Sequence, residues 1–331
     1  MTRHATITVP SPTATRRSLP DAHWEPFLSA LTGRLAQPTP DLLSVRCVTR
    51  QTLVQLIGEV ASELQLPSTF PTGRKVIEHL VSMGFASHVP IADVSGSSPS
   101  RDFILLGIQE SRDQQVDPLE LLQAYDQQGV ICYFSALAYY DLTTQMPSSH
   151  HIASLMKHTV EPGAKSTGKP STAPAATKRR SKLGTHVFSY EGVPFYSTKR
   201  ARNTIPGVKT RVLSPATNIR IATVEQTLLD TLQYPFHFGG AEVVLESWQQ
   251  ATGKTDDDLF AAYLRAIQIL PLTRRAGALF ELLGLRPAGA LGTYLDETKK
   301  LILAQPEIPW IPLLRGVPYS RESAGWKVLV P

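Results

Sequence analysis

Basic side chains, which could bind an anionic partner, are concentrated in one central stretch of this chain. Residues 161–224 include twelve Lys or Arg and two Glu, a net charge of +10, whereas the whole chain of 331 residues carries +5. The remainder therefore sums to −5. Such a local charge attracts polyanions, either nucleic acid or the acidic face of a protein. A solvated basic loop without a partner is the alternative explanation.

Eight of these cations form a predicted supplementary basic surface. Some lie within residues 161–182, whose Gly, Ser, Thr, Pro and Lys content is typical of an exposed linker or loop. The others lie among or just after the predicted strands 186–190 and 193–196. The set consists of Lys178, Arg179, Arg180, Lys199, Arg200, Arg202, Lys209 and Arg211.

A second group of candidate contacts comes from the N-terminal third of the chain. Its apolar residues recur at helical spacing and predict helices at about 21–35, 50–64 and 71–83. Residues 85–92 and 101–107 then predict a β-hairpin. This order is typical of a winged helix-turn-helix, whose second motif helix enters the DNA major groove. We expect Thr72, Lys75 and His79 to read base edges, and Arg50, Arg74 and Arg101 to contact phosphates.

The same order of elements also occurs in protein-interaction modules. The loop between the predicted hairpin strands contains Ser, Gly and Pro with Asp93 and Asp102 at its ends, and only Arg101 is basic. A wing of this composition favours phosphate contact less than a basic one does. Protein interaction therefore remains an alternative.

The rest of the chain predicts a mixed α/β domain with a helical C-terminal part, so the fold class is α/β (α+β). We expect a disordered tail at 1–20, a winged helix-turn-helix domain at 21–110, and a second domain at 111–331 with a flexible loop at 161–182. In that second domain Ser135 is a candidate N-cap of a short helix, and Thr223 with Gln226 matches a capping box. Further helices are predicted at 117–128, 240–250, 256–269, 271–283 and 290–305, and strands at 218–222, 310–314 and, as an edge strand, 326–331.

Several enzyme and metal classes lack support. The segment 163–169 has the spacing of a phosphate-binding loop, but Pro170 follows where Ser or Thr would bind magnesium. Asp256, Asp257 and Asp258 point in different directions on a helix and are expected to cap it. His150, His151 and His158 have no cysteine or carboxylate cluster beside them. We therefore expect no metal, no cofactor and no enzymatic activity.

The location in the cell is predicted from cysteine use and hydropathy. Cys47 and Cys132 are expected to be buried, reduced thiols. No window reaches the roughly 18 to 20 apolar residues that a membrane span needs. The N-terminus lacks the apolar run of a secretory signal. A cytoplasmic protein is expected.

Two stretches carry a resemblance to a known family. Within 133–152, a Ser-Ala-Leu helix leads into Leu-Thr-Thr-Gln-Met-Pro and then a strand; residues 221–230 read Ile-Ala-Thr-Val-Glu-Gln-Thr-Leu-Leu-Asp. Both resemble the antitoxins of the abortive-infection E family (AbiEi), and the resemblance covers about residues 119–283.

The resemblance implies a type IV toxin-antitoxin system that protects against phage. Its antitoxin opposes a nucleotidyltransferase toxin encoded beside it and represses the shared promoter, which is expected to contain inverted repeats. Family members typically have a basic wing, and this chain departs from that pattern. The alternatives are a protein-interaction or sensor component of a defence system that has lost DNA binding, and, third, a nucleic-acid-processing enzyme.

Overall fold

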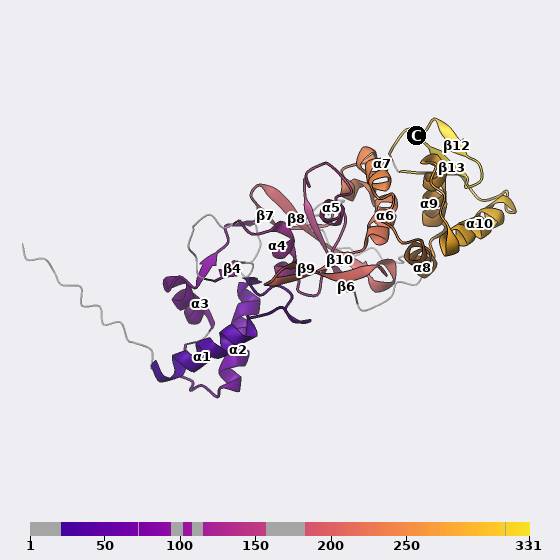
Figure 1. The fold of residues 1–331 in the computed structure, drawn as a ribbon. Coiled ribbons are helices and arrows are strands. Elements are labelled where there is room, and N and C mark those ends of the chain that lie inside the picture. Colours follow the sequence, from indigo (N-terminus) through magenta and orange to yellow (C-terminus); the bar gives the residue numbers. More distant parts are fainter. Residues whose placement is uncertain (1–20, 72, 94–101, 108–114, 157–182, 315) are drawn as a thin grey trace, which may run out of the picture.

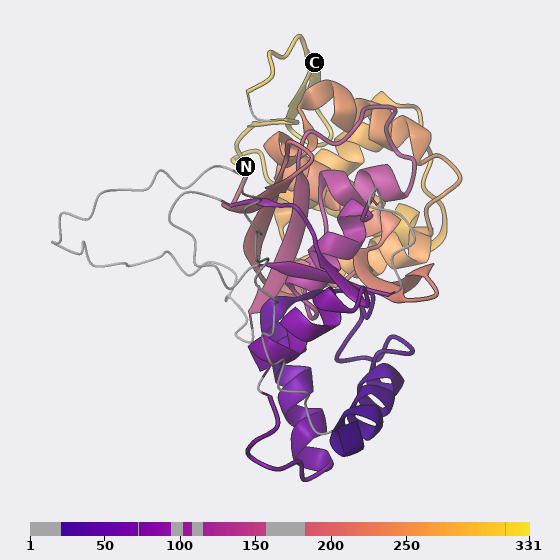
Figure 2. The same ribbon diagram turned by 90° about the vertical axis from the view of Figure 1, so that its left-hand side faces the viewer.

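The structure, a computed structural model, describes residues 21–71, 73–93, 102–107, 115–156, 183–314 and 316–331. An N-terminal unit, a seven-stranded sheet with packed helices and a helical C-terminal part follow one another along the molecule (Figures 1 and 2). The mixed α/β class is confirmed. In the described part of the chain, no helix is long and apolar enough to cross a bilayer.

The N-terminal unit combines three helices with a three-stranded sheet. Its helices are α1 (Asp21–Arg34), α2 (Arg50–Glu63) and α3 (Gly73–Ser82), and its strands are β1 (Cys47–Thr49), β2 (Ala86–His88) and β4 (Phe103–Leu106). The strand order is β1-β4-β2, with antiparallel neighbours. The α2 helix begins where the Thr49 hydroxyl accepts the amide of Thr52 (3.2 Å), a cap that satisfies one free N–H. This succession of elements is that of a winged helix.

Strand β4 is buried on both faces. Ile104 packs into the helical core of the N-terminal unit, whereas Phe103 and Leu105 belong to the larger core of the rest of the protein. The Phe103 ring lies 4.9 Å from that of Phe188 in the central sheet. A bidentate ion pair between Arg46 and Glu120 adds a polar link across the same boundary. The two predicted domains are thus packed together through this sheet.

The predicted hairpin is confirmed only in part. Strands β2 and β4 pair, and the Val89 amide extends the ladder by donating to Phe103 (3.0 Å). The following strand β3 (Ala92–Asp93) instead pairs with β7 (Thr185–Tyr190) of the central sheet. Pro90 has no N–H to continue the β2 ladder, which explains why the chain leaves it there.

The central sheet is mixed, with the order β3-β7-β8-β6-β5-β10-β9. Parallel pairs join β6 to β8 and β5 to β10, and the other neighbours are antiparallel. Its further strands are β5 (Val130–Ile131), β6 (His150–Met156), β8 (Val193–Ala201), β9 (Val208–Ser214) and β10 (Thr217–Ala222). Helices α4 (Pro118–Tyr125) and α5 (Phe134–Tyr139) pack against it, and α6 (Val224–Gln233) follows β10 and packs against α5. Strand β9 was not predicted, because its exposed edge position removes the apolar alternation.

Of two predicted helix caps, one is absent and the other forms only in part. Helix α5 follows Tyr133, while the Ser135 hydroxyl accepts the amide of His151 (2.9 Å) on the neighbouring strand. Thr223 does cap α6 by accepting the Gln226 amide, as predicted. The Gln226 side chain, however, turns to the Gly207 amide and to Asp230 and completes no capping box.

The C-terminal part contains four helices and a small sheet. The helices are α7 (Ala241–Gln250), α8 (Asp257–Ile267), α9 (Leu270–Leu282) and α10 (Gly289–Leu303), and the strands are β11 (Ile311–Pro312), β12 (Arg321–Ser323) and β13 (Val328–Val330). Strand β13 lies between the other two, so the prediction of an edge strand was wrong. Buried Arg274 donates to the carbonyls of Pro309 (2.7 Å) and Trp326 (2.8 Å), which fixes α9 against this sheet.

Gly277 on α9 provides a test of this packing. A Cβ at that position would lie 2.3 Å from the Trp326 ring, whereas a Cβ on exposed, helical Gly58 meets nothing within 4 Å. We expect Gly277→Ala to lower the free energy of unfolding by about 1–3 kcal/mol through overpacking. Gly58→Ala should raise it by about 0.4–1 kcal/mol, because it restricts the unfolded chain. Urea titrations compare the two; equal effects would contradict the close packing.

Candidate nucleic-acid interface

Helix α3 presents a polar face to solvent. Val76, Ile77 and Leu80 are buried, while Arg74 and Lys75 are exposed. The start of α3 lies close to α2, because a Cβ on Gly73 would come within 2.8 Å of the Val54 side chain. The exposed face can therefore meet a partner directly, as a recognition helix does.

An aromatic cluster fixes α3 against α1. The Trp24 ring lies 5.6 Å from both Phe27 and Phe70, and 4.8 Å from the ring of His79. His79 is half-buried by this contact. We therefore assign His79 to the positioning of α3, which leaves Arg74 and Lys75 as the cations that the face offers.

Charge in the N-terminal unit is nevertheless acidic. Residues 21–107 include six Lys or Arg and eight Asp or Glu, a net charge of −2. Four of the arginines form ion pairs: Arg34 with Glu63, Arg46 with Glu120, Arg50 with Asp102, and Arg74 with Glu78. Among the described cations of the unit, Lys75 alone has no ion pair. These residues therefore do not form a general phosphate-binding surface.

Arg74 and Arg50, two of the predicted phosphate contacts, differ in how readily a phosphate could bind them. Arg74 and Glu78 are exposed and 3.0 Å apart, and such a surface pair contributes only about 0–1 kcal/mol, so a phosphate can compete for it. Arg50 pairs with Asp102 at 3.0 Å, and its amide also donates to the Asp102 carbonyl (2.7 Å). Arg50 therefore connects α2 to β4. Thr72 and Arg101 lie outside the described residues.

The predicted supplementary surface is only partly formed by described residues. Lys199 is exposed on β8, and Arg202 is exposed in the short 3-10 helix η2 (Arg202–Thr204). Lys209 and Arg211 are exposed on the edge strand β9. Lys178, Arg179 and Arg180 lie outside the described part of the chain, as do His158 and the segment 163–169. Lys209 and Arg211 make the β9 edge of the sheet basic, whereas Lys199 and Arg202 are exposed on the interior strand β8 and directly after it.

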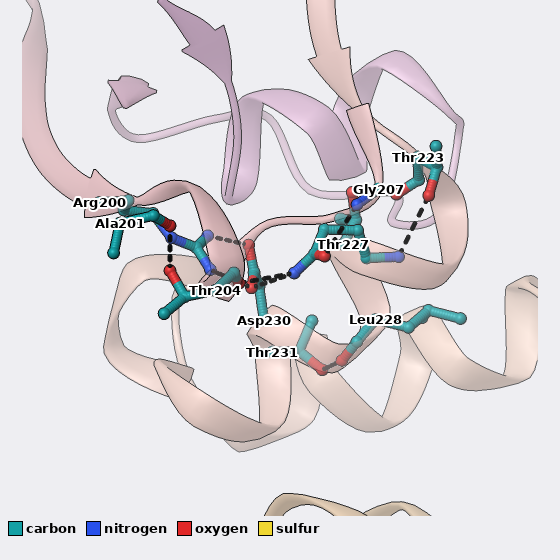
Figure 3. A network of polar contacts seen from close by, with 10 residues as sticks. Arg200, Ala201, Thr204, Gly207, Thr223, Thr227, Leu228, Asp230 and Thr231 are labelled. Atoms are coloured by element: carbon teal, nitrogen blue, oxygen red, sulfur yellow. Dashed lines mark hydrogen bonds and ion pairs between the residues drawn. The ribbon is translucent and has the colours of Figure 1, made fainter. Parts of the chain in front are cut away.

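The prediction that Arg200 belongs to the basic surface was wrong. Its side chain is 3% exposed, and it pairs with the 1% exposed carboxylate of Asp230 on α6. Two parallel hydrogen bonds join the groups, and Arg200 also donates to the Thr204 carbonyl (2.7 Å), as Figure 3 shows. A buried guanidinium needs such a partner to offset its desolvation. Arg200 therefore belongs to the interior.

Further polar and aromatic groups complete this buried pair. Gln226 donates to the Asp230 carboxylate (2.9 Å), and the guanidinium lies 5.6 and 5.5 Å from the rings of Tyr133 and Tyr234. Burial raises the pKa of Asp230, and Arg200 and Gln226 oppose that rise by stabilising the ionised form. Tyr133 itself has a φ of 56°, a backbone conformation that is uncommon for residues other than glycine. The network joins Arg200 on β8 to Tyr133, which precedes α5, and to Asp230 on α6. Tyr133 and Asp230 lie within the two stretches of family resemblance.

Arg220 on β10 is a candidate that the sequence reasoning did not single out. Its guanidinium shares an open polar cavity of about 450 Å³ with Arg202, Thr210, Asn218 and Gln128. The alternation of Ile219, Arg220 and Ile221 is the signal that could have revealed it, since a charged residue between two buried apolar ones points to the other side of a strand.

A second cavity is apolar. It measures about 620 Å³ and lies between α1 and the sheet of the N-terminal unit, with Leu28, Leu31, Leu80 and Leu106 among its walls. Its charged group, Arg46, is already neutralised by Glu120. This groove therefore offers apolar contact area but no free charge.

The buried ion pair yields a stability prediction. Asp230→Asn leaves the Arg200 charge without its counterion, so we expect a loss of about 3–5 kcal/mol in the free energy of unfolding. The matched change Glu78→Gln breaks an exposed pair and should cost about 0–1 kcal/mol. Chemical denaturation measures both. Similar losses for the two variants would show that the Arg200–Asp230 pair is not structurally important.

No protein-family model matches the chain, and no curated protein is a significant match. Among solved structures, the crystal structure of the Rv2827c protein from Mycobacterium tuberculosis is similar, with a TM-score of 0.48 and 14% sequence identity. The match covers 92% of this chain and 91% of that chain.

Proposed function

We propose that this protein is a DNA-binding regulator of the antitoxin type, which binds its own promoter through helix α3. The observation that carries the proposal is the exposed face of α3 in a winged-helix unit, with Lys75 unpaired and Arg74 in a weak surface pair. A side chain of this kind can donate to base edges or phosphates in the major groove.

Antitoxin activity is the second part of the proposal. It rests on the resemblance of residues 133–152 and 221–230 to AbiEi antitoxins. These stretches supply α5, β6 and α6, whose contacts surround the buried Arg200–Asp230 pair. We expect these packed elements to present the surface that meets a cognate nucleotidyltransferase toxin.

A specific observation favours a different function, namely protein interaction without DNA binding. The N-terminal unit has a net charge of −2, and its described arginines are ion-paired. DNA affinity depends on cations that replace phosphate counterions, and an acidic unit supplies few of them. Under this alternative the winged helix acts as a scaffold or sensor in a defence system.

DNA binding separates the two proposals. We expect the purified protein to shift the DNA upstream of its own gene in the presence of unrelated competitor DNA, and to bind more weakly as salt increases. The double variant Arg74→Ala with Lys75→Ala should weaken specific binding by about 1–3 kcal/mol. The measurement is a mobility-shift titration at two salt concentrations.

Lys300→Ala is the control for loss of a cation far from α3. Lys300 is exposed on α10, at the other end of the molecule from α3 (Figure 1), and its loss changes the total charge without touching the proposed interface. The DNA proposal fails if the α3 double variant binds as well as Lys300→Ala does. Loss of the shift on addition of competitor would favour the interaction protein.

The antitoxin part needs its own experiment. We expect co-expression of this protein to relieve growth inhibition by the nucleotidyltransferase encoded beside its gene. The Arg74→Ala with Lys75→Ala variant should still relieve inhibition, because α3 is separate from the elements that carry the resemblance. If growth inhibition persists with the wild-type protein, the antitoxin assignment is wrong even where DNA binding is found.

A further inference from the structure

The polar cavity beside Arg220 is built from parts of the chain that are far apart in sequence. One wall is the segment 38–43, another is Gln128 after α4, and the remaining walls come from η2, β9 and β10. The Leu43 carbonyl accepts the amide of Asn218 (2.8 Å), so the first wall is attached directly to the sheet. The cavity therefore has a defined shape.

Arg220 has a fixed orientation at this site. Its Nη1 donates to the Gln128 backbone carbonyl (2.8 Å) and to the Gln128 side-chain oxygen (3.1 Å). The Gln128 amide nitrogen donates in turn to the Pro40 carbonyl (3.0 Å). A guanidinium already ordered by its neighbours loses less conformational entropy when an anion binds.

A second guanidinium lies close to the first. Burial lowers the pKa of Arg220, and the positive charge of Arg202 lowers it further. The negative charge of Asp126 raises the pKa of Arg220. The Asp126 carboxylate, however, already accepts hydrogen bonds from the Ser154 hydroxyl (2.5 Å) and the Gln128 backbone amide (3.1 Å). Among the described residues, no carboxylate forms an ion pair with Arg202 or Arg220.

Neutral donors line the same cavity. Thr210 on β9 is the register partner of Arg220 on β10, and Asn218 lies two residues before Arg220. A hydroxyl and an amide beside two guanidiniums that form no ion pair with a described residue suit a tetrahedral oxyanion, because arginine donors match phosphate geometry. A carboxylate ligand would use fewer of these donors.

We infer that this cavity is a phosphate-binding site, in which Arg202 and Arg220 bind the anion and Thr210 and Asn218 complete its shell. The phosphate could belong to a nucleic-acid backbone or to a free nucleotide, and both present the same oxygens. The inference stands independently of the proposed role of α3, because the residues and the surface are different.

The test uses the full chain and three probes: inorganic phosphate, adenosine 5′-monophosphate with adenosine as the phosphate-free control, and a short random-sequence duplex. We expect phosphate to raise the melting temperature of the wild-type protein, with a Kd about tenfold higher in Arg202→Gln and Arg220→Gln, since each loses a charge-assisted hydrogen bond. Arg321→Gln, an exposed arginine on β12, is the matched control and should behave as wild type.

The other two probes identify the source of the phosphate. If it belongs to nucleic acid, the Arg202→Gln and Arg220→Gln variants weaken duplex binding. Each variant also lowers the slope of log affinity against log salt by about one, as expected for the loss of one phosphate contact. If it belongs to a free nucleotide, they weaken binding of the monophosphate but leave duplex binding unchanged. Either result supports the site.

Two results would overturn it: no stabilisation of the wild-type protein by phosphate, or equal Kd values in Arg202→Gln, Arg321→Gln and the wild type. Arg202 is exposed, so Arg202→Gln keeps the test valid even where Arg220→Gln reduces folding. The Arg74→Ala with Lys75→Ala variant should retain phosphate binding. This separates failure of the cavity from failure of α3 as a DNA reader.

Discussion

Burial of strand β4 on both faces is the constraint on which the arrangement of this protein depends. Ile104 belongs to the core of the helical unit, and Phe103 and Leu105 belong to that of the α/β body, so one strand is shared by both cores. The sheet face that points away from the helices is covered by the α/β body, and β3 continues into the central sheet. The orientation of α3 relative to the basic sheet edge is therefore set by apolar packing.

Charge is divided by environment within the basic stretch. Arg200 forms an ion pair with Asp230 in the interior, where a buried charge requires a partner to offset its desolvation. Arg202, two residues later, is exposed. Arg274 is also buried, yet it donates to backbone carbonyls. Counting cations along the chain thus overstates the surface charge, and only the structure separates interior arginines from those that can meet a ligand.

The sequence predicted local features well and distant contacts poorly. The apolar periodicity of residues 50–64 predicted α2 to within one residue, and Asp256 was correctly expected to cap α8. The fold class was also right. By contrast, the Arg200–Asp230 pair joins residues thirty positions apart, and the Arg220 cavity needs the segment 38–43. Periodicity and capping report on neighbours along the chain, so neither could reveal these contacts.

The edge strand β9 has a consequence for the behaviour of the protein in solution. An unpaired strand edge can join the sheet of another molecule, and exposed Val212 would add apolar area to such a contact. Lys209 and Arg211 lie on the same strand, and charged side chains on an edge repel a second copy of that strand. While they are free of a polyanionic ligand, these cations therefore oppose aggregation. A polyanion that neutralised them would remove that protection and bring the molecules closer to self-association.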